Sequence, residues 1–364
     1  MRSVFVSPCV EEEFYGGVQF TARLALEGLT AHAGSGELKV LCYGPRCGLS
    51  GKGRGPSSKG RADSGNRACS HSKAGAVSDA LKARGWAQQL IFWHLDLLKL
   101  LPFLGSGAGR KYLFLHGVEC WRPLEGFTRR LVDRIDMFLT NSEFTWNRFT
   151  EINPRWKNAS HRAVRLGVGI PENFIEPPGQ IPAAVIIGRM NAGEGYKGHR
   201  ELIEAWPLVL KRVSGAELWI VGGGDAAGDL RGLASAGAAS GQIRFFGAVS
   251  EDQKQNLLRQ SRCMVLPSRG EGFGLVYLEA MRLGRPCLSS VHDAGQEVIG
   301  PPQAGIAIDP GDTEALAAAL IRLLTPGQEW QQWSAEAQSR YESTFTAAHF
   351  QSRLLHALQE KLVG

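Results

Sequence analysis

The chain has 364 residues, of which 43% are hydrophobic and 21% are charged. This length is enough for two domains of ordinary size, and the composition is typical of a soluble globular enzyme. No apolar run approaches the roughly 18 residues that a membrane helix needs, which excludes a helical integral membrane protein. The seven cysteines form no C-x-x-C pair, so neither a disulfide framework nor a zinc site is expected. Reduced thiols and an N-terminus that turns acidic within a dozen residues predict a cytoplasmic protein.

Positive charge is concentrated in one stretch, residues 44–75, which holds seven basic residues against the single acid Asp63. The resulting +6 equals the formal net charge of the whole chain. Because this stretch is rich in Gly and Ser and nearly free of large apolar residues, it predicts a mobile loop. Two interpretations stay open: a solvated surface loop, or a contact with an anionic acceptor or an anionic membrane face. Nucleic acid is not an expected partner, because no aromatic residues are interleaved with the basic ones.

The first half of the chain alternates short apolar runs with helical patterns. Strands are predicted at residues 3–6, 38–43, 90–94, 112–115, 137–140 and 164–167, with helices at about 19–29 and 77–84. Such alternation is typical of a doubly wound α/β domain. Gly16 and Gly17 stand at a helix start, where glycine lets the backbone approach a ligand closely. His116 directly follows a strand, at the edge of a parallel sheet that usually carries the chemistry.

A cluster of prolines and glycines between Gly167 and Pro182 marks a domain boundary. The α/β pattern then restarts, with strands predicted at 183–187, 217–221, 243–247, 263–267, 286–290 and near Ile306. A helix opened by residues 196–199 is expected to run to about Val213, and another from Leu275 to Leu283. Two α/β halves joined by a linker predict a ligand in a cleft between them.

The stretch from Cys263 to Arg282 carries the clearest chemical signal. A strand ending at Pro267 is followed by a glycine-punctuated loop, Ser268 to Gly274, and then by a helix. Free backbone N–H groups at such a helix start form an anion or phosphate site. Glu271 in the loop and Glu279 in the helix add two acceptors. N–H donors beside two carboxylates suit a ligand with both phosphate and vicinal hydroxyls, such as a nucleotide sugar.

Several motifs in chain order resemble the retaining glycosyltransferases of family 4. The motifs are Tyr15-Gly16-Gly17-Val18, Leu115-His116-Gly117-Val118-Glu119, Asn141-Ser142-Glu143-Phe144-Thr145, Gly188-Arg189 with Lys197-Gly198-His199, Phe246-Gly247-Ala248-Val249, and Glu271-Gly272-Phe273-Gly274-Leu275 with Glu279. The resemblance implies the GT-B fold, two Rossmann-like domains facing across a cleft. It also implies an acceptor domain at 1–168, a linker at 169–182, a donor domain at 183–345 and a helix at 346–364 that returns to the first domain. Phe350, Leu354, Leu358 and Leu362 form an i, i+4 stripe suited to that return.

The resemblance also implies residue roles. Arg189 and Lys197 would hold the donor diphosphate, where charge grows as the glycosidic bond breaks. Glu271 would contact donor sugar hydroxyls, aided by the backbone N–H groups of Phe273, Gly274 and Leu275. Glu279 would bind the ribose hydroxyls, and Gly247 to Val249 would line the base pocket. In the first domain, Gly16 and Gly17 would reach the phosphates, His116 would contact the sugar or stabilise charge, and Glu119 would cap its turn.

The implied reaction transfers a sugar from a UDP- or GDP-sugar to an acceptor hydroxyl with retention. It belongs to polysaccharide, lipopolysaccharide or glycolipid synthesis, and its acceptor is a carbohydrate or a lipid-linked molecule. The absence of a D-x-D triplet favours neutralisation of the diphosphate by Arg and Lys, without a metal or other cofactor. The expected location is the cytoplasm, with the inner face of the cell membrane as a further contact through the basic stretch.

The sequence disfavours one alternative activity and leaves two open. Gly222, Gly224 and Ala227 match a dinucleotide fingerprint, but no acidic residue follows at about 20 positions, which disfavours an NAD enzyme. A nucleotide-sugar 2-epimerase and a non-catalytic nucleotide-sugar-binding paralogue stay open as alternatives on the same fold. One segment departs from the family: residues 292–297 replace the usual Gly-Gly-x-x-Glu turn, with Glu297 kept in register.

Overall fold

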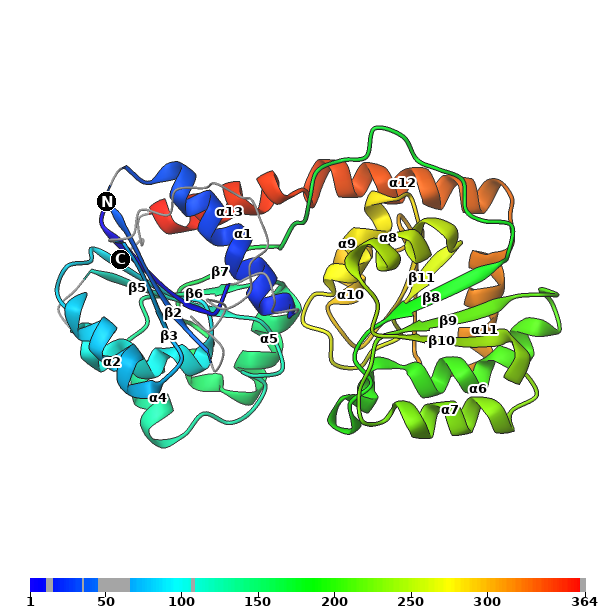
Figure 1. Ribbon diagram of the computed structural model, residues 1–364, viewed down its shortest axis with the longest axis horizontal. Helices are drawn as coiled ribbons and strands as arrows, with labels where there is room; N and C mark the ends of the chain where they lie inside the picture. Colours follow the sequence, from blue (N-terminus) through cyan, green and yellow to red (C-terminus); the bar gives the residue numbers. More distant parts are fainter. Residues whose placement is uncertain (11–15, 35, 45–65, 106–108, 361–364) are drawn as a thin grey trace, which may run out of the picture. The chain divides into compact units, whose positions relative to one another are not determined.

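The computed structural model describes residues 1–10, 16–34, 36–44, 66–105 and 109–360. The chain divides into two compact units (Figure 1). Met1–Leu166 together with Ala348–Gly364 form the first, called here the N-terminal unit. Gly167–Ala347 form the second, the C-terminal unit.

The N-terminal unit is built on a parallel sheet with the strand order β3-β2-β1-β4-β5-β6-β7 in its described part. The strands are β1 (Ser3–Pro8), β2 (Leu38–Tyr43), β3 (Arg67–Ser70), β4 (Gln89–Phe92), β5 (Arg110–Leu115), β6 (Met137–Thr140) and β7 (His161–Ala163). The central strands are buried and read as continuous apolar runs, because helices cover both faces of a parallel sheet.

Helices pack on both faces of this sheet (Figure 1). They are α1 (Gly17–His32), α2 (Lys73–Lys82), η1 (Leu95–Leu100), α3 (Leu101–Leu104), α4 (Gly126–Val132), α5 (Glu143–Ile152), η2 (Pro154–Trp156) and α13 (Ala347–Gln359). In Figure 1, α1 and α13 lie side by side, and the Gln351 side chain donates to the Leu24 carbonyl at 3.0 Å.

Helix α13 is anchored in the N-terminal unit through its apolar stripe. Phe350, Leu354 and Leu358 are buried, and the Phe350 ring meets Trp93 edge to face at 6.2 Å. The Gln89 amide and the Tyr112 hydroxyl both donate to the Leu358 carbonyl, at 2.8 and 3.0 Å. Leu362, the fourth residue of the predicted stripe, lies outside the described residues.

The C-terminal unit has a second parallel sheet with the order β10-β9-β8-β11-β12-β13. Its strands are β8 (Ala183–Ile187), β9 (Glu217–Val221), β10 (Ile243–Gly247), β11 (Cys263–Val265), β12 (Cys287–Ser290) and β13 (Gly305–Ile308). Its helices are η3 (Ala192–Lys197), α6 (His199–Leu210), α7 (Ala227–Ala236), η4 (Ser240–Gln242), α8 (Glu251–Gln260), α9 (Leu275–Arg282), α10 (Gly295–Ile299), α11 (Thr313–Leu324) and α12 (Gln328–Thr344). Helix α6 contacts α7 and α11, whereas α9 contacts α8 and α12, so the sheet lies between two helical layers (Figure 1).

The basic stretch is not a loop over its whole length, which corrects the prediction for residues 44–75. Residues 45–65 lie outside the described residues, but Arg67–Ser70 pair in parallel with β2 as the edge strand β3. Helix α2 then begins at Lys73, and Ser72 caps it by accepting from the Gly75 amide. An edge strand has one neighbour only, so it needs few apolar side chains, and the composition therefore did not reveal it.

Strand β7 is also displaced from its predicted position, 164–167, to His161–Ala163. Val164 and Leu166 are buried as their apolar character suggests. They nevertheless lie beyond the last β6–β7 pair, Thr140 with Ala163. Burial in this segment therefore does not coincide with strand pairing. In the described part of the chain, no helix has the length and apolar character to cross a membrane.

The glycines that resemble a dinucleotide fingerprint have a structural explanation. Gly222 has a φ of +131°, and a Cβ there would lie 2.0 Å from the Gly188 carbonyl oxygen. Gly224 has a φ of +156°, and its Cβ would lie 2.2 Å from the Met190 oxygen. Both positions accept only glycine, because the turn after β9 packs directly on the backbone that follows β8.

Candidate functional site

The carboxyl ends of β8 and β11 bring an opposite-charge pair together in the C-terminal unit. Lys197 ends η3, and its Nζ lies 3.2 Å from Oε2 of Glu271 in the loop after β11. Both side chains are largely buried, at 13% and 22% exposed. Burial alone would lower the pKa of Lys197, but Glu271, Tyr196 and Glu194 together outweigh it and raise that pKa. Lys197 is therefore a cation held in place at this edge of the sheet.

Arg189 follows β8 on the same edge but makes a different pair. Its Nη2 lies 2.5 Å from Oε1 of Glu194, and its side chain is 70% exposed. The Tyr196 ring lies among these groups: burial raises the pKa of its hydroxyl, and four charges act on it, those of Lys197, Glu194, Glu271 and Arg189. The two predicted diphosphate residues thus lie on the same edge of the sheet, and Arg189 is exposed but paired with Glu194.

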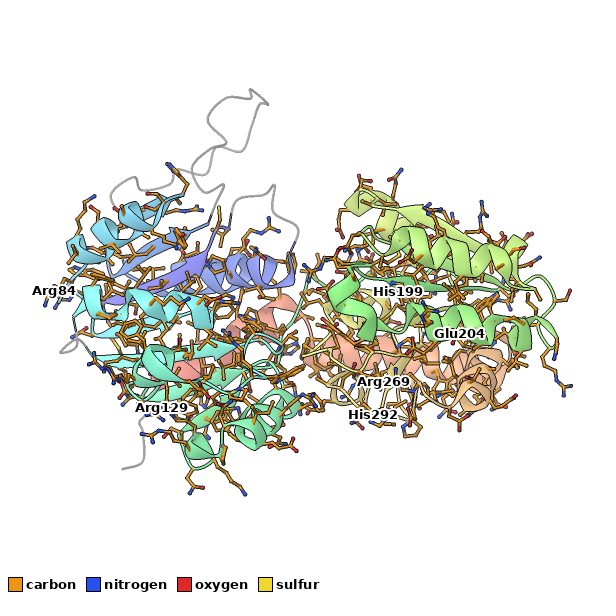
Figure 2. The ribbon with its side chains drawn as sticks, turned by 90° about the horizontal axis from the view of Figure 1, so that it is seen from below. Arg84, Arg129, His199, Glu204, Arg269 and His292 are labelled. Carbon is orange, nitrogen blue, oxygen red and sulfur yellow. The ribbon has the colours of Figure 1, made fainter. Side chains whose placement is uncertain are left out.

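The Ser268–Gly274 loop is shaped by its neighbours. Gly270 faces the Tyr196 ring, where a Cβ would come within 2.8 Å of a ring carbon. The Arg269 amide donates to the Tyr196 carbonyl at 2.9 Å. The Arg269 side chain pairs with Glu201 of α6 at 2.5 Å, and Figure 2 labels Arg269 on this unit. The loop is therefore tied on both sides to the segment that carries Lys197.

Helix α9 begins without a side-chain cap. Gly274 is its N-cap residue in the left-handed conformation, and as a glycine it has no side chain to cap the first N–H groups. Phe273 is buried and Leu275 is half-buried. The predicted backbone donors therefore start a helix whose orphan N–H groups and dipole favour an anion.

Glu279 lies in α9 and is paired with a residue that sequence analysis did not single out. Its Oε2 lies 2.8 Å from Nζ of Lys254 in α8, and the same Nζ lies 2.9 Å from Glu251. Burial raises the pKa of Glu279, against the opposing effect of Lys254. The carboxylate predicted to bind ribose is therefore already held by a neighbouring cation.

The predicted base pocket follows β10. Gly247 has a φ of +71°, and its carbonyl accepts from the Gly222 amide at 2.8 Å. Val249 is half-buried and precedes the capping box of α8, in which Ser250 and Gln253 bond reciprocally. This fixed helix start places Lys254 one turn inside α8, next to Glu279.

The N-terminal unit holds the remaining predicted residues. Gly16 is the N-cap residue of α1, which again has no side-chain cap, and Gly17 is its first residue. His116 follows β5, and its Nε2 lies 2.7 Å from the Trp93 carbonyl. A carbonyl only accepts, so Nε2 carries the proton and Nδ1 of the neutral ring is an acceptor. Burial lowers the pKa of His116 to about 4. Glu119 caps the turn, as predicted, by accepting from the His116 amide at 2.5 Å.

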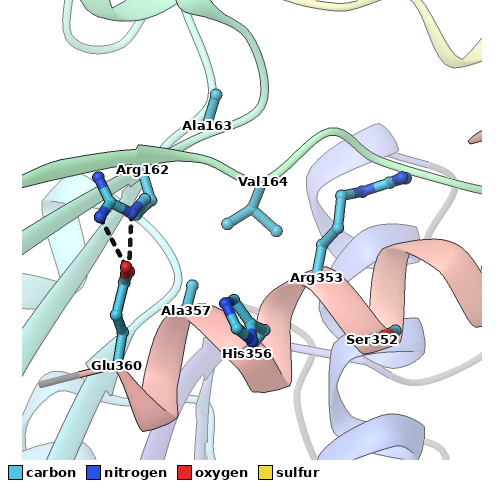
Figure 3. A pocket seen from close by; sticks show the side chains of 8 residues that line it. All are labelled: Arg162, Ala163, Val164, Ser352, Arg353, His356, Ala357 and Glu360. Carbon is cyan, nitrogen blue, oxygen red and sulfur yellow. Dashed lines mark hydrogen bonds and ion pairs between the residues drawn. The ribbon is translucent and has the colours of Figure 1, made fainter.

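Two further observations concern other kinds of site. Among the described residues, no group of three or more His, Cys, Asp or Glu side chains could hold a metal ion. A cavity of about 280 Å³ lies in the N-terminal unit between β7 and α13 (Figure 3). Arg162 in its wall is bound by both oxygens of Glu360, at 2.7 and 2.6 Å, so the two charges cancel.

Comparisons with known proteins bear on the C-terminal unit most directly. Residues 181–326 match the family described as Glycosyl transferases group 1. This segment contains Arg189, Lys197, Glu271 and Glu279. This part of the C-terminal unit is similar in sequence to that family. The resemblance inferred from the motifs of this segment is therefore confirmed.

Curated relatives extend this finding. The chain is 34% identical over 168 residues to a phosphatidyl-myo-inositol mannosyltransferase of Mycobacterium leprae, which covers 45% of this chain and 44% of that protein. It is 28% identical to a GDP-mannose-dependent monoacylated alpha-(1-6)-phosphatidylinositol monomannoside mannosyltransferase of Corynebacterium glutamicum. This match covers 70% of this chain and 71% of that protein. The match thus spans less than half of the first relative.

A solved structure covers nearly the whole chain. Sucrose-phosphate synthase of Thermosynechococcus elongatus matches with a TM-score of 0.74 at 16% identity, over 99% of this chain and 98% of that one. A likeness at this identity concerns the fold. It confirms the predicted GT-B class, with two α/β units each built on a parallel sheet.

Proposed function

We propose that the protein is a glycosyltransferase that moves a hexose from a nucleotide-diphosphate sugar to an acceptor hydroxyl with retention. The observation that carries this proposal is the buried Lys197–Glu271 pair, with Arg189 on the same edge of the sheet, inside the segment that matches the glycosyltransferase family. Two cations and a carboxylate at the carboxyl edge of a parallel sheet suit a diphosphate joined to a sugar.

The donor we propose first is GDP-mannose, because one relative is named as GDP-mannose-dependent; a UDP-sugar is the second candidate. The acceptor we propose is a lipid-linked or glycolipid hydroxyl, since the related enzymes are named for phosphatidylinositol acceptors. Peripheral contact with the inner face of the cell membrane would follow from such an acceptor.

The proposed roles follow from the contacts. The Lys197 ammonium has three donors, so it can keep its bond to Glu271 and also bind a diphosphate oxygen. Arg189, exposed beyond its pair with Glu194, would close on the same diphosphate and stabilise the leaving charge. Phe273, Gly274 and Leu275 would contribute backbone N–H groups, and Gly16 and Gly17 would contribute others.

The remaining roles concern hydroxyl groups and the base. Glu271 would accept from the donor sugar, and Glu279 would accept from the ribose beside Lys254. Gly247 and Val249 would line the base. The neutral His116 ring offers Nδ1 as an acceptor for a sugar hydroxyl, which favours a sugar contact over charge stabilisation. Because cations of the chain neutralise the diphosphate, we expect nucleotide binding to be unchanged by EDTA.

A ligand panel tests this proposal. A ligand that binds the folded state raises the unfolding temperature according to its concentration and Kd. We expect GDP and GDP-mannose to raise it more than UDP, ADP and their sugars. If none of these nucleotides raises it, the transferase proposal fails. Release of a 2-epimer from the donor without an acceptor would identify the epimerase alternative, and binding without turnover on any lipid acceptor would identify the non-catalytic one.

A further inference from the structure

A buried carboxyl group beside the candidate donor site has no role in the function proposed above. Asp293 follows β12 and is fully buried. Its Oδ1 accepts from the Gly295 amide at 2.8 Å, at the start of α10. Its Oδ2 is buried and has no hydrogen bond of good geometry within the described part of the chain. A buried carboxyl oxygen without a partner is costly, and it calls for an explanation.

Asp293 borders the turn that carries Glu271. The amide of the next residue, Ala294, donates to the Glu271 carbonyl at 3.1 Å. The Ser268 hydroxyl and the Glu271 amide lie near the Asp293 carboxyl group and act to lower its pKa, although Oδ2 itself has no hydrogen bond of good geometry. Ser268 is fully buried as well, and its Oγ accepts from the Gly270 amide at 3.1 Å.

The electrostatic surroundings of Asp293 favour its neutral form. Burial raises the pKa of Asp293 to about 8, and the negative charge of Glu271 adds to the rise, against the opposing effect of hydrogen bonds from Gly295, Glu271 and Ser268. Tyr277 of α9 is the other ionisable group that interacts with it. No cation of the described chain is among the groups that shift the pKa of Asp293. At neutral pH the carboxyl group therefore keeps its proton.

We propose that Asp293 is a positioning residue: protonated, it holds the Ser268–Glu271 turn, and with it Glu271, in the geometry that binds the donor sugar. This inference rests on the proposed function. A protonated carboxyl is a hydrogen-bond donor, and the Ser268 hydroxyl oxygen can accept from it as well as from Gly270. The position lies in segment 292–297, where this chain departs from the usual Gly-Gly-x-x-Glu turn.

Loss of this proton would have a local effect. A second negative charge beside Glu271, in a site of low dielectric, would repel that carboxylate. The contact of Glu271 with the sugar would weaken, whereas the base and ribose contacts proposed for Gly247, Val249 and Glu279 do not involve Asp293. The affinity for the sugar part of the donor is therefore expected to fall with rising pH, and the affinity for the nucleotide to fall less.

Calorimetric titration of the full chain with GDP and with GDP-mannose, from pH 6.5 to 9.5, tests this inference. The ratio of the two Kd values reports how much the sugar contributes to binding. We expect the advantage of GDP-mannose over GDP to fall at least about threefold across this range in the unchanged protein, following the ionised fraction of Asp293. Asp293→Asn imitates the neutral acid, and its ratio should stay constant. Asp229→Asn, an exposed acid in the first turn of α7, is the control and should behave as the unchanged protein.

The outcomes separate this inference from the proposed function. An equal decline in Asp293→Asn, or no decline in the unchanged protein, would overturn the role of Asp293 and leave the donor site standing. UDP and UDP-glucose form a second pair, to be used if GDP does not bind. If both nucleotides bind but neither sugar adds affinity at any pH, the inference fails alone. If no nucleotide binds, the inference and the proposed function fail together.

Discussion

Lys197 and Glu271 face each other at 3.2 Å, so removing one charge leaves the other largely buried without its partner. Lys197→Ala would place the Glu271 carboxylate alone where the diphosphate is proposed to bind. We expect the Kd for GDP to rise at least about tenfold, as measured by calorimetry. Arg231→Ala is a matched control in α7, where the guanidinium packs over Phe245 at 4.6 Å. An unchanged Kd in Lys197→Ala would show that the diphosphate binds elsewhere.

Asp293 also makes a prediction about stability, without any ligand. Its pKa in the folded chain, about 8, lies above that of an unfolded aspartate, 3.8. Protons are therefore bound more tightly by the folded state, and stability falls as pH rises from about 4 to about 8. Asp293→Asn removes this penalty. We expect its unfolding temperature to exceed that of the unchanged protein at pH 8, with the gap closing toward pH 5. A gap that does not vary with pH would contradict this.

Site residues were predicted best where neighbouring positions in the sequence form the site. The Glu271–Glu279 segment and the Lys197–Gly198 pair were recognisable because a loop and a helix start fix their own backbone donors. Lys254 and Asp293 were not recognisable, because each reaches the site through a contact with another element of the fold. Lys254 reaches Glu279 only when α8 packs beside α9, and Asp293 reaches the Glu271 turn only when β12 pairs with β11.

At the scale of elements, α13 illustrates how one helix completes a unit. Phe350 is fully buried and meets Trp93. Phe350→Ala would remove this ring from the core, and we expect a loss of about 3–5 kcal/mol in the unfolding free energy of the N-terminal unit. Urea unfolding followed by tryptophan fluorescence measures it. Ser352→Ala on the exposed side of the same helix should change little, and equal effects of both variants would argue against a specific role of the buried face.

Several strands were predicted at their observed limits. The limits predicted for β2 and β6 agree with the structure, because continuous apolar runs bounded by polar or glycine residues have few other interpretations. The edge strands β3 and β7 of the N-terminal unit were missed or displaced, whereas the edge strand β10 was predicted at its observed limits. An edge strand is half solvated, so its sequence carries little hydrophobic pattern, and its limits are set by pairing with a neighbour far along the chain.

At the scale of the whole molecule, three histidines predict a response to acid. Burial lowers the pKa values of His116, His161 and His199 to about 4. The unfolded value is 6.5, so their contribution to stability is complete above pH 6.5 and is lost as pH falls toward 4. We expect the unfolding temperature to fall steadily over this range, with net proton uptake on unfolding.

One histidine allows this acid response to be dissected. His161 stacks on Trp146 with ring centroids 4.3 Å apart, and its Nε2 donates to the Thr140 hydroxyl. His161→Phe keeps an aromatic ring on Trp146 but cannot take up a proton. We expect the dependence of the unfolding temperature on pH to become shallower in this variant. His71→Gln, at an exposed site, should leave it unchanged, and an equally steep dependence in His161→Phe would contradict the assignment.

The division of the chain has a consequence for how the protein is made. The C-terminal unit is one continuous segment, Gly167–Ala347, whereas the N-terminal unit needs both Met1–Leu166 and the residues from Ala348 onward. During translation, the C-terminal unit begins second, but its last residue is synthesised before the N-terminal unit is complete. Until α13 has been synthesised, the surface around Trp93 and Tyr112 that this helix covers stays exposed. A chain terminated at residue 347 would therefore have one complete unit and one unit whose apolar surface for α13 is exposed to chaperones and proteases.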